Sequence, residues 1–204
     1  MASEEVVTLG LIVEGHGEEE AAPTLIRHIA RELSFHASIR CEVRRVPKSQ
    51  LIQPGELERA VEALTRQIGR RQPVLVLLDA DDDCPKDLAE KLRARCHAKH
   101  ADLTISIVIA KREYEAWFLA AARSLAGQRG LAEQLDSPVD PESVQGAKEW
   151  LTARMPSDQS YSPTRHQAAY SDLMDLSEAR KARSFKKLEK EFEPSAGMAT
   201  GMTG

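Results

Sequence analysis

The sequence predicts an α/β protein in which a central parallel sheet of about four strands is flanked by helices, with a C-terminal helical extension. Three observations support this fold class. Four apolar runs have the length of strands, segments of helical periodicity alternate with them, and the alternation ends near residue 126. Such alternation, with almost continuously apolar strands, is typical of a parallel sheet covered by helices. We therefore expect an α/β core over residues 1–126 and a helical extension packed on it over residues 127–193.

The predicted strands are rich in β-branched and other apolar residues. The first, third and fourth are apolar almost throughout, which predicts burial on both faces of the sheet. The second carries several arginines, which favours an edge strand or an exposed face. The four strands are expected over residues 6–13, 41–46, 74–79 and 103–110.

The predicted helices repeat apolar residues every three or four positions, so that one face of each can pack on the sheet. Helices of the core are expected over residues 19–33, 56–69, 85–98 and 113–125. Beyond residue 127, glycine and proline interrupt the pattern, and three shorter helices are expected over residues 143–154, 166–176 and 178–192. The final residues, 194–204, have little to bury, so a disordered tail is expected there.

Bulk composition limits the classes of function. The 204 residues suit one domain with a core of its own. A formal net charge of −4 disfavours a protein that attracts nucleic acid by an overall positive electrostatic potential. Aromatic residues make up only 4% of the chain, which disfavours binding by base stacking. The apolar runs are too short to span a membrane and no signal-peptide pattern is present, so a cytoplasmic protein without membrane association is expected. The cysteines, an unpatterned set of three, fit free thiols in a reducing compartment.

Acidic side chains follow two of the predicted strands, at the point where each strand ends. Glu14 comes directly after the first strand, and Asp79 and Asp81 end the third. Because the carboxyl ends of parallel strands meet at one edge of a sheet, these carboxylates are expected to lie together. Crowded carboxylates repel one another unless a cation lies between them, so the pattern predicts a site for Mg²⁺ or Mn²⁺. The alternatives are a helix-terminal acid for Glu14 and a solvated acidic turn at residues 79–83.

The segment VEGHGEE at residues 13–19, followed by a strand that ends in DADDD at residues 79–83, resembles the Toprim domain of topoisomerases, bacterial primases and OLD-type nucleases. With EYEAWF at residues 113–118, the chain looks most like the OLD-type branch. More narrowly, it looks like a small stand-alone prokaryotic family of unknown function, often encoded near ATPases of the ABC or AAA type. The resemblance covers residues 6–126 and, more weakly, residues 145–192.

This resemblance implies hydrolysis of nucleic acid, with DNA as the expected substrate, at a centre of two Mg²⁺ or Mn²⁺ ions. Glu14, Asp79 and Asp81 would bind metal and act in catalysis, and Glu18 would help to bind a second ion. Glu113 or Glu115 would complete the site, and we favour Glu115 because Trp117 and Phe118 define the inward face of the helix. The setting implied is prokaryotic antiphage or mobile-element defence, with an ATPase partner.

Lysines near these acids are candidates for stabilising negative charge in a phosphoryl transition state. We place Lys148 in the predicted catalytic set, although a solvated helix lysine is the plainer interpretation, and Lys111 is a second candidate. His16, between Gly15 and Gly17, is either a phosphate contact or an exposed turn residue. Arg165 and His166 either point at the site or lie in an exposed loop.

Several other interpretations stay open. One is a non-catalytic Toprim-like adaptor or regulatory subunit that binds a structural ion. Another is a receiver-like domain with Asp79 as phosphoacceptor and Lys111 beside it, although the Glu-Gly on the first strand counts against it. A zinc site lacks a CxxC pair and would use Cys84, Cys96, His97 and His100. Two basic segments are either DNA-backbone patches or solvated faces, namely residues 179–190 and the set Arg40, Arg44, Arg45 and Lys48.

Overall fold

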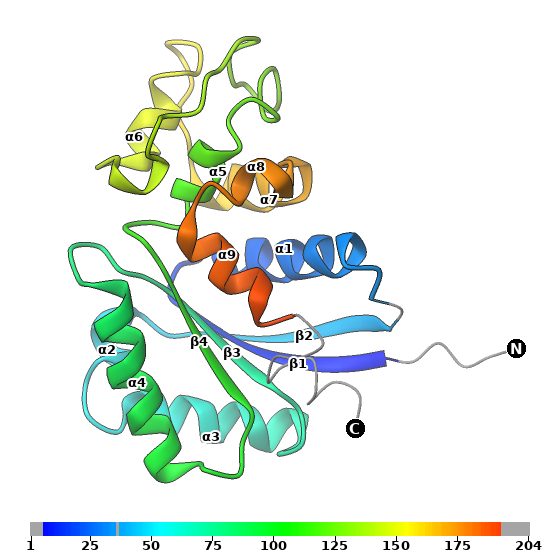
Figure 1. Ribbon diagram of the computed structural model, residues 1–204, viewed down its shortest axis with the longest axis vertical. Helices are drawn as coiled ribbons and strands as arrows, with labels where there is room; N and C mark the ends of the chain where they lie inside the picture. The colour runs from blue at the N-terminus through cyan, green and yellow to red at the C-terminus, as the bar shows by residue number, and fades with distance from the viewer. Residues whose placement is uncertain (1–5, 36, 193–204) are drawn as a thin grey trace, which may run out of the picture.

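The structure is a computed structural model that describes residues 6–35 and 37–192. Within these residues, four parallel strands form one sheet in the order β2-β1-β3-β4 (Figure 1). Their bounds are Val6–Val13 for β1, Ser38–Arg45 for β2, Val74–Asp79 for β3 and Ile105–Ala110 for β4. The predicted fold class is confirmed: the chain is an α/β protein with a four-stranded parallel sheet, flanking helices and a C-terminal helical region. The basic second strand lies at one edge, as its sequence predicts.

Helices cover both faces of the sheet. Helix α1 (Glu18–Glu32) lies on one face, while α3 (Glu56–Ile68) and α4 (Pro85–Lys99) lie on the other (Figure 1). These three helices agree with their predicted bounds to within one residue at either end. The single turn α2 (Lys48–Leu51) is not predicted, because four residues are too few to show helical periodicity.

The C-terminal region follows β4 as short helices joined by turns. They are α5 (Ala116–Ala120), α6 (Ala147–Thr152), α7 (Ala168–Leu173), α8 (Leu176–Ala179) and α9 (Arg183–Lys190), with a 3₁₀ turn over Pro141–Ser143 and a π-helical turn over Pro163–Gln167. The longer predicted helices are therefore broken. The expected helix 178–192 is interrupted where Ala182 adopts an extended conformation. The expected helix 113–125 is confined to Ala116–Ala120, and because residues 114–122 are all buried, apolar periodicity does not mark its ends.

Two apolar cores lie on the two sides of the sheet. The larger one contains Leu9 and Leu11 of β1 together with Trp117, Tyr170 and Phe185 of the C-terminal region. The smaller one joins the opposite face of the sheet to α3 and α4. The Trp117 indole N–H donates to the Ser184 hydroxyl oxygen over 2.8 Å, which satisfies a buried donor within the larger core. The C-terminal helices therefore share one core with the sheet.

The sheet order also determines where a ligand can bind. From β1 the chain passes along α1 to β2 on one side, while β3 pairs with β1 on the other. A crevice at the carboxyl ends of the strands is expected where the order reverses in this way, between β1 and β3. No helix in the described part of the chain is both long enough and apolar enough to cross a membrane. The expected tail, residues 194–204, falls outside the residues that the structure describes.

Candidate metal centre

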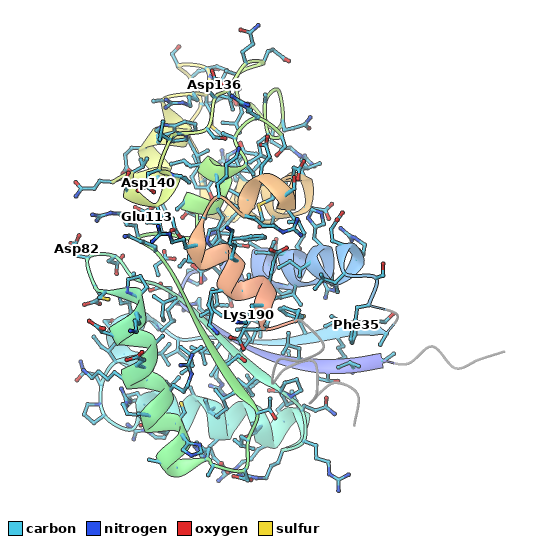
Figure 2. The ribbon with its side chains drawn as sticks, viewed as in Figure 1. Phe35, Asp82, Glu113, Asp136, Asp140 and Lys190 are labelled. Carbon is cyan, nitrogen blue, oxygen red and sulfur yellow. The ribbon has the colours of Figure 1, made fainter. Side chains whose placement is uncertain are left out.

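A cavity of about 750 Å³ lies at the carboxyl ends of β1 and β3. Its walls are the turn after β1, the first residue of α1, the segment around α2 and the π-helical turn. Figure 2 shows Asp82 and Glu113 on the loops that follow β3 and β4, at this same end of the sheet. Six predicted site residues line the cavity: Glu14, Glu18, Asp79, Asp81, Glu115 and Lys148.

Three of these acids form a compact carboxylate triad, Glu14, Glu18 and Asp79. One oxygen from each lies within 4.8 Å of the others, and the described residues contain no second group of three or more potential metal ligands this close. The triad therefore provides an acidic site that can hold a metal ion at the carboxyl edge of the sheet.

Backbone amides hold the triad in place. The Asp79 amide donates to Glu14 Oε1 over 2.6 Å, and the Tyr114 amide donates to Asp79 Oδ1 over 2.7 Å. The Glu14 amide donates to Glu18 Oε2 over 3.1 Å. Within the described residues, the second oxygen of each carboxylate accepts no hydrogen bond, so three oxygens remain for a ligand.

The electrostatics of the triad favour a cation. Burial, with the neighbouring charge of Glu14, raises the pKa of Glu18 to about 7. Burial also raises the pKa of Asp79 well above its usual range, and Glu18, Glu115 and Glu14 add to the effect. The pKa of Glu14 is raised as well, mainly by burial. Placing three like charges in a partly buried site is unfavourable until a proton or a metal ion neutralises them.

Glu115 stands beside the triad in a buried network. It is 0% exposed, and its Oε1 accepts hydrogen bonds from Tyr161 Oη over 2.9 Å and, at the limit, from Gln167 Nε2 over 3.4 Å. Burial raises the pKa of Glu115, and the charge of Lys148 opposes the rise. The Lys148 Nζ atom lies 2.9 Å from Glu113 Oε2 and 3.3 Å from Glu115 Oε2. Lys148 thus bridges the two candidate acids, while Glu115 is the one that lines the cavity.

Within the part of the chain that the structure describes, two buried oxygens of this network have no hydrogen-bond donor. They are Glu115 Oε2, which the Lys148 ammonium approaches without hydrogen-bond alignment, and Gln167 Oε1. Buried acceptors of this kind are rare in proteins and mark places where water or a cation binds. Both residues line the cavity, so the donor set fits a hard cation, which takes carboxylate and amide oxygens.

Asp81 is held apart from the triad by an ion pair. Its backbone φ is 51°, and its Oδ2 accepts a hydrogen bond from Lys48 Nζ over 2.8 Å. The same ammonium donates to Ala80 O over 2.7 Å and lies 3.2 Å from Asp83 Oδ2. Burial alone would lower the pKa of Lys48, but these two aspartates outweigh it and the pKa rises. Lys48 is therefore part of the site and not of an open basic patch.

The π-helical turn closes one wall of the cavity over Gly17. A Cβ placed on Gly17 would lie 2.2 Å from Gln167 Oε1 and 2.8 Å from the Pro163 carbonyl carbon. Glycine is required here by close approach, because no side chain fits between α1 and the turn. π-helical turns occur often at functional sites. Gln167 ends this turn and lines the cavity, so it is a candidate functional residue.

Other candidate residues lie outside the triad. Lys111 lines a different cavity, which removes the lysine that a receiver would need beside Asp79. His16 lines the metal cavity but is exposed and pairs with Glu19 at 3.0 Å. Cys84 and Cys96 lie at opposite ends of α4, about 18 Å apart at 1.5 Å per residue, so the alternative zinc set does not assemble. The three cysteines are free thiols.

The basic segment 179–190 forms an amphipathic surface, with part of its charge paired and part exposed. Arg180 pairs with Glu189 at 2.8 Å and Lys187 with Glu191, while Phe185 and Leu188 are buried.

Sequence reasoning missed Lys48, Tyr161 and Gln167 as parts of the site. Only Lys48 had a signal, since it follows the end of β2 at the same edge of the sheet as the acids.

Comparison with known proteins gives one match. Residues 13–193 match a family described as "Domain of unknown function (DUF4276)". Neither the curated proteins nor the solved structures yield a significant match. The matched span begins at the last residue of β1 and contains the triad, the Glu115 network and the C-terminal helices. Because it covers most of the sequence, the chain belongs to the DUF4276 family.

Proposed function

We propose that this protein is a metal-dependent hydrolase of Toprim type that cleaves phosphodiester bonds in nucleic acid, with DNA as the substrate. The observation that carries the proposal is the carboxylate triad, whose three ligand oxygens lie within 4.8 Å of one another at the reversal of strand order. Oxygen-only ligands favour Mg²⁺ or Mn²⁺ over softer metals. The resemblance of VEGHGEE and DADDD to Toprim sequences points to the same chemistry.

The residues of the cavity have distinct parts in this proposal. Glu14, Glu18 and Asp79 hold the first ion, and Glu115 with the free oxygen of Gln167 offers ligands for a second. Metal ions bound there would polarise a phosphoryl oxygen and activate water as the nucleophile. Lys148 carries its charge at the cavity wall, where it can stabilise negative charge that develops on the phosphate.

Asp81 has a different part in this proposal from the one the resemblance implies. Its Oδ2 pairs with Lys48, and in this proposal Asp81 lies at the cavity rim, outside the triad. The three donors of the Lys48 ammonium are directed at Ala80 O, Asp81 and Asp83 within the protein itself. The triad stays intact without Asp81.

A second candidate function is a non-catalytic adaptor that binds a structural ion. The ion pairs favour it, because Lys48 and Lys148 neutralise Asp81, Glu113 and Glu115 within the protein itself. In that case the triad would bind metal for stability alone. The two functions predict the same metal binding and differ in cleavage.

The test combines metal binding with cleavage in three proteins. Calorimetry with Mn²⁺ and nicking of supercoiled plasmid are measured for the wild type, Asp79→Asn and the control Asp136→Asn. Asparagine keeps an oxygen that can accept the hydrogen bond from the Tyr114 amide, so the fold is preserved while the charge of one ligand is lost. Asp136 is an exposed acid that pairs with Arg123 far from the cavity.

We expect the wild type and Asp136→Asn to bind Mn²⁺ and to nick the plasmid. In Asp79→Asn the affinity should fall by on the order of tenfold or more, and nicking should be lost. Metal binding without cleavage in the wild type would favour the adaptor. Equal metal binding by all three proteins would refute the site.

The proposed biological setting is prokaryotic defence with an ATPase partner of the ABC or AAA type. It is supported by the family resemblance and by no contact in this chain. Co-purification of an ATPase encoded beside the gene would test it, and separate elution of the two proteins at micromolar concentration would count against it.

A further inference from the structure

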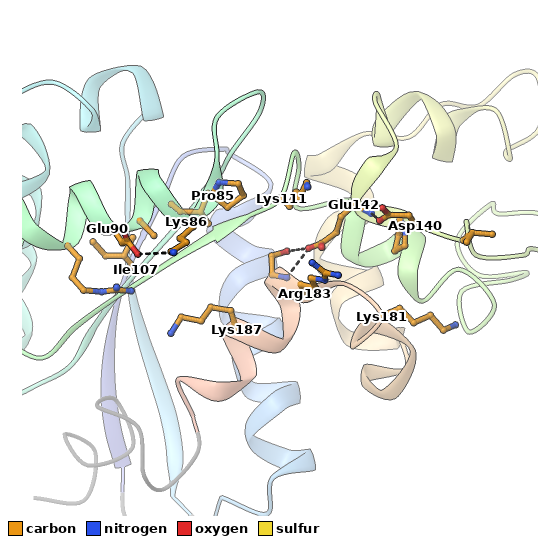
Figure 3. Close-up of a pocket in the computed structure, with 16 residues that line it drawn as sticks. Pro85, Lys86, Glu90, Ile107, Lys111, Asp140, Glu142, Lys181, Arg183 and Lys187 are labelled. Carbon is orange, nitrogen blue, oxygen red and sulfur yellow. Dashed lines mark hydrogen bonds and ion pairs between the residues drawn. The ribbon is translucent and has the colours of Figure 1, made fainter.

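A second cavity, of about 620 Å³, lies along the outer edge of the sheet between α4 and α9. We call it the β4 groove, because Ile107 and Ile109 of the edge strand β4 line it. Figure 3 shows Lys86 on α4 and Lys187 on α9 on opposite sides of β4. The groove belongs to a different part of the surface from the metal centre and contains none of the triad residues.

The β4 groove is basic in a protein that is acidic as a whole. It is lined by six lysines and arginines but only three acids, whereas the formal net charge of the chain is −4. The six cations are Lys86, Arg93, Lys111, Lys181, Arg183 and Lys187. A local excess of positive charge of this kind attracts an anionic partner.

The acids of the groove do not cancel this charge. Glu142 is buried and accepts hydrogen bonds from the amide and the hydroxyl of Ser184, and Asp140 accepts from the Glu142 amide. Both are therefore used to hold the 3₁₀ turn. Only Glu90 approaches a groove cation, Lys86, at 3.9 Å.

Half of the groove cations are without an acidic partner. Among residues 6–35 and 37–192, Arg93, Lys111 and Arg183 form no ion pair, and their side chains are exposed. On α4, Lys86 and Arg93 are about 10 Å apart along the axis, and on α9, Arg183 and Lys187 are about 6 Å apart. The two helices therefore offer two rows of cations to one elongated polyanion between them.

The chemistry of the lining favours a phosphodiester backbone over nucleic acid bases. No aromatic side chain lines the groove, so it offers no platform for base stacking. Lysine and arginine contacts to phosphate are independent of sequence. A nucleic acid backbone laid between α4 and α9 would therefore be held by its charge.

The groove borders the metal centre through three chain segments. Lys111 lines the groove, and two residues later Glu113 pairs with Lys148 of the metal cavity. Glu142 lines the groove and precedes Lys148 by six residues, and Asp81 of the metal cavity precedes Pro85 of the groove by four. A strand held in the groove thus runs past loops that also form the metal centre.

We propose that the β4 groove binds the phosphodiester backbone of nucleic acid and leads a strand to the metal centre. This inference rests on the proposed hydrolase function for its biological sense, but the binding itself requires no metal. The groove supplies the local basic surface that an acidic protein needs to hold nucleic acid.

The test is anisotropy of a labelled 20-nucleotide single-stranded DNA in EDTA, which prevents cleavage. The groove variant combines Arg93→Gln, Lys111→Gln and Arg183→Gln. The matched control, Arg71→Gln, Lys91→Gln and Arg129→Gln, also removes two arginines and one lysine, all exposed and outside both cavities. Each binding curve is repeated over a range of salt concentrations, and a polyglutamate peptide serves as competitor.

We expect the control to bind as the wild type does. The groove variant should bind on the order of tenfold more weakly, and its log–log salt slope should be smaller by about 2, at about 0.7 per lost phosphate contact. Equal weakening in both triple variants would overturn the proposal, as would unchanged binding in the groove variant. Displacement of the DNA by polyglutamate at equal charge would show that the groove receives an acidic protein segment instead, and would also overturn it.

The groove proposal and the hydrolase proposal can be refuted independently of each other. Asp79→Asn removes a triad ligand and should bind the DNA in EDTA as the wild type does. Selective loss of binding in the groove variant, with no cleavage by the wild type, would support the groove and refute the hydrolase. Cleavage by the wild type with normal DNA binding by the groove variant would support the hydrolase and refute the groove proposal.

Discussion

Replacing Glu18 by glutamine should stabilise the metal-free protein at neutral and alkaline pH while weakening metal binding. Glu18 is 6% exposed, and its Oε2 accepts hydrogen bonds from the Glu14 and Gly15 amides. A glutamine keeps an oxygen for these bonds and has the same shape. The substitution therefore removes charge from the triad with little change in packing.

The magnitude follows from the pKa of Glu18, which is about 7 in the fold against 4.5 for an ordinary glutamate. At about 1.4 kcal/mol for each pKa unit, ionising this side chain in the folded protein costs about 3 kcal/mol. Because the folded pKa lies above the unfolded one, the folded state binds the extra proton. Stability is therefore greatest below about pH 4.5 and falls as the pH rises through 7. Glutamine has no such titration, so the variant should gain about 3 kcal/mol on the wild type by pH 8.

Urea unfolding in EDTA, followed by tryptophan fluorescence at pH 4.5 and pH 8, measures this difference. With an m value of about 2–3 kcal/mol/M, the midpoints of the two proteins should differ by about 1 M at pH 8 and by little at pH 4.5. Mn²⁺ at a hundred times the wild-type dissociation constant should then narrow this difference, because it stabilises the wild type by about 3 kcal/mol and the weaker-binding variant by less. Parallel stability curves for the two proteins across this pH range would refute the reasoning.

Three further substitutions test the packing around the site. Gly17→Ala should lower the free energy of unfolding by about 1–3 kcal/mol, because its Cβ meets the Pro163 backbone; an unchanged urea midpoint would contradict the close approach. Tyr161→Phe should cost about 1–3 kcal/mol by removing the hydroxyl that donates to the buried Glu115, measured in the same way. Phe185→Ala should cost about 3–5 kcal/mol and keep a single unfolding transition by calorimetry, since this ring lies in the core shared with the sheet; two separate transitions would mean an independent C-terminal domain.

The bounds of β1 and β3 could be predicted, whereas β2 begins three residues before and β4 two residues after the predicted start. Val6–Val13 and Val74–Asp79 are uninterrupted apolar runs that stop at carboxylates, so their bounds agree with the structure residue for residue. Parallel pairing then brings both carboxyl ends to one edge without further information. This is why Glu14 and Asp79 could be placed together from the sequence alone. Glu18 follows because it begins the helix that starts one turn later.

Contacts between distant segments could not be predicted, because no local pattern records them. Gln167 reaches Glu115 from a π-helical turn that has no apolar periodicity, and Tyr161 does so from an extended segment. Asp81 shows the opposite case. Its spacing from Asp79 suggests a shared metal, but a positive φ and the approach of Lys48 direct its carboxylate elsewhere.

The repulsion within the triad connects stability to ligand binding. Lys148 is held by Glu113 and Glu115, and Lys48 by Asp81 and Asp83, so neither lysine is committed to Glu14, Glu18 or Asp79. The backbone amides fix these three carboxylates in place, and they cannot separate to relieve their charge. Protons and metal ions therefore compete for the same oxygens. In the proposed metal site this repulsion would favour the binding of a cation, and the stability lost near neutral pH would be the counterpart of that affinity.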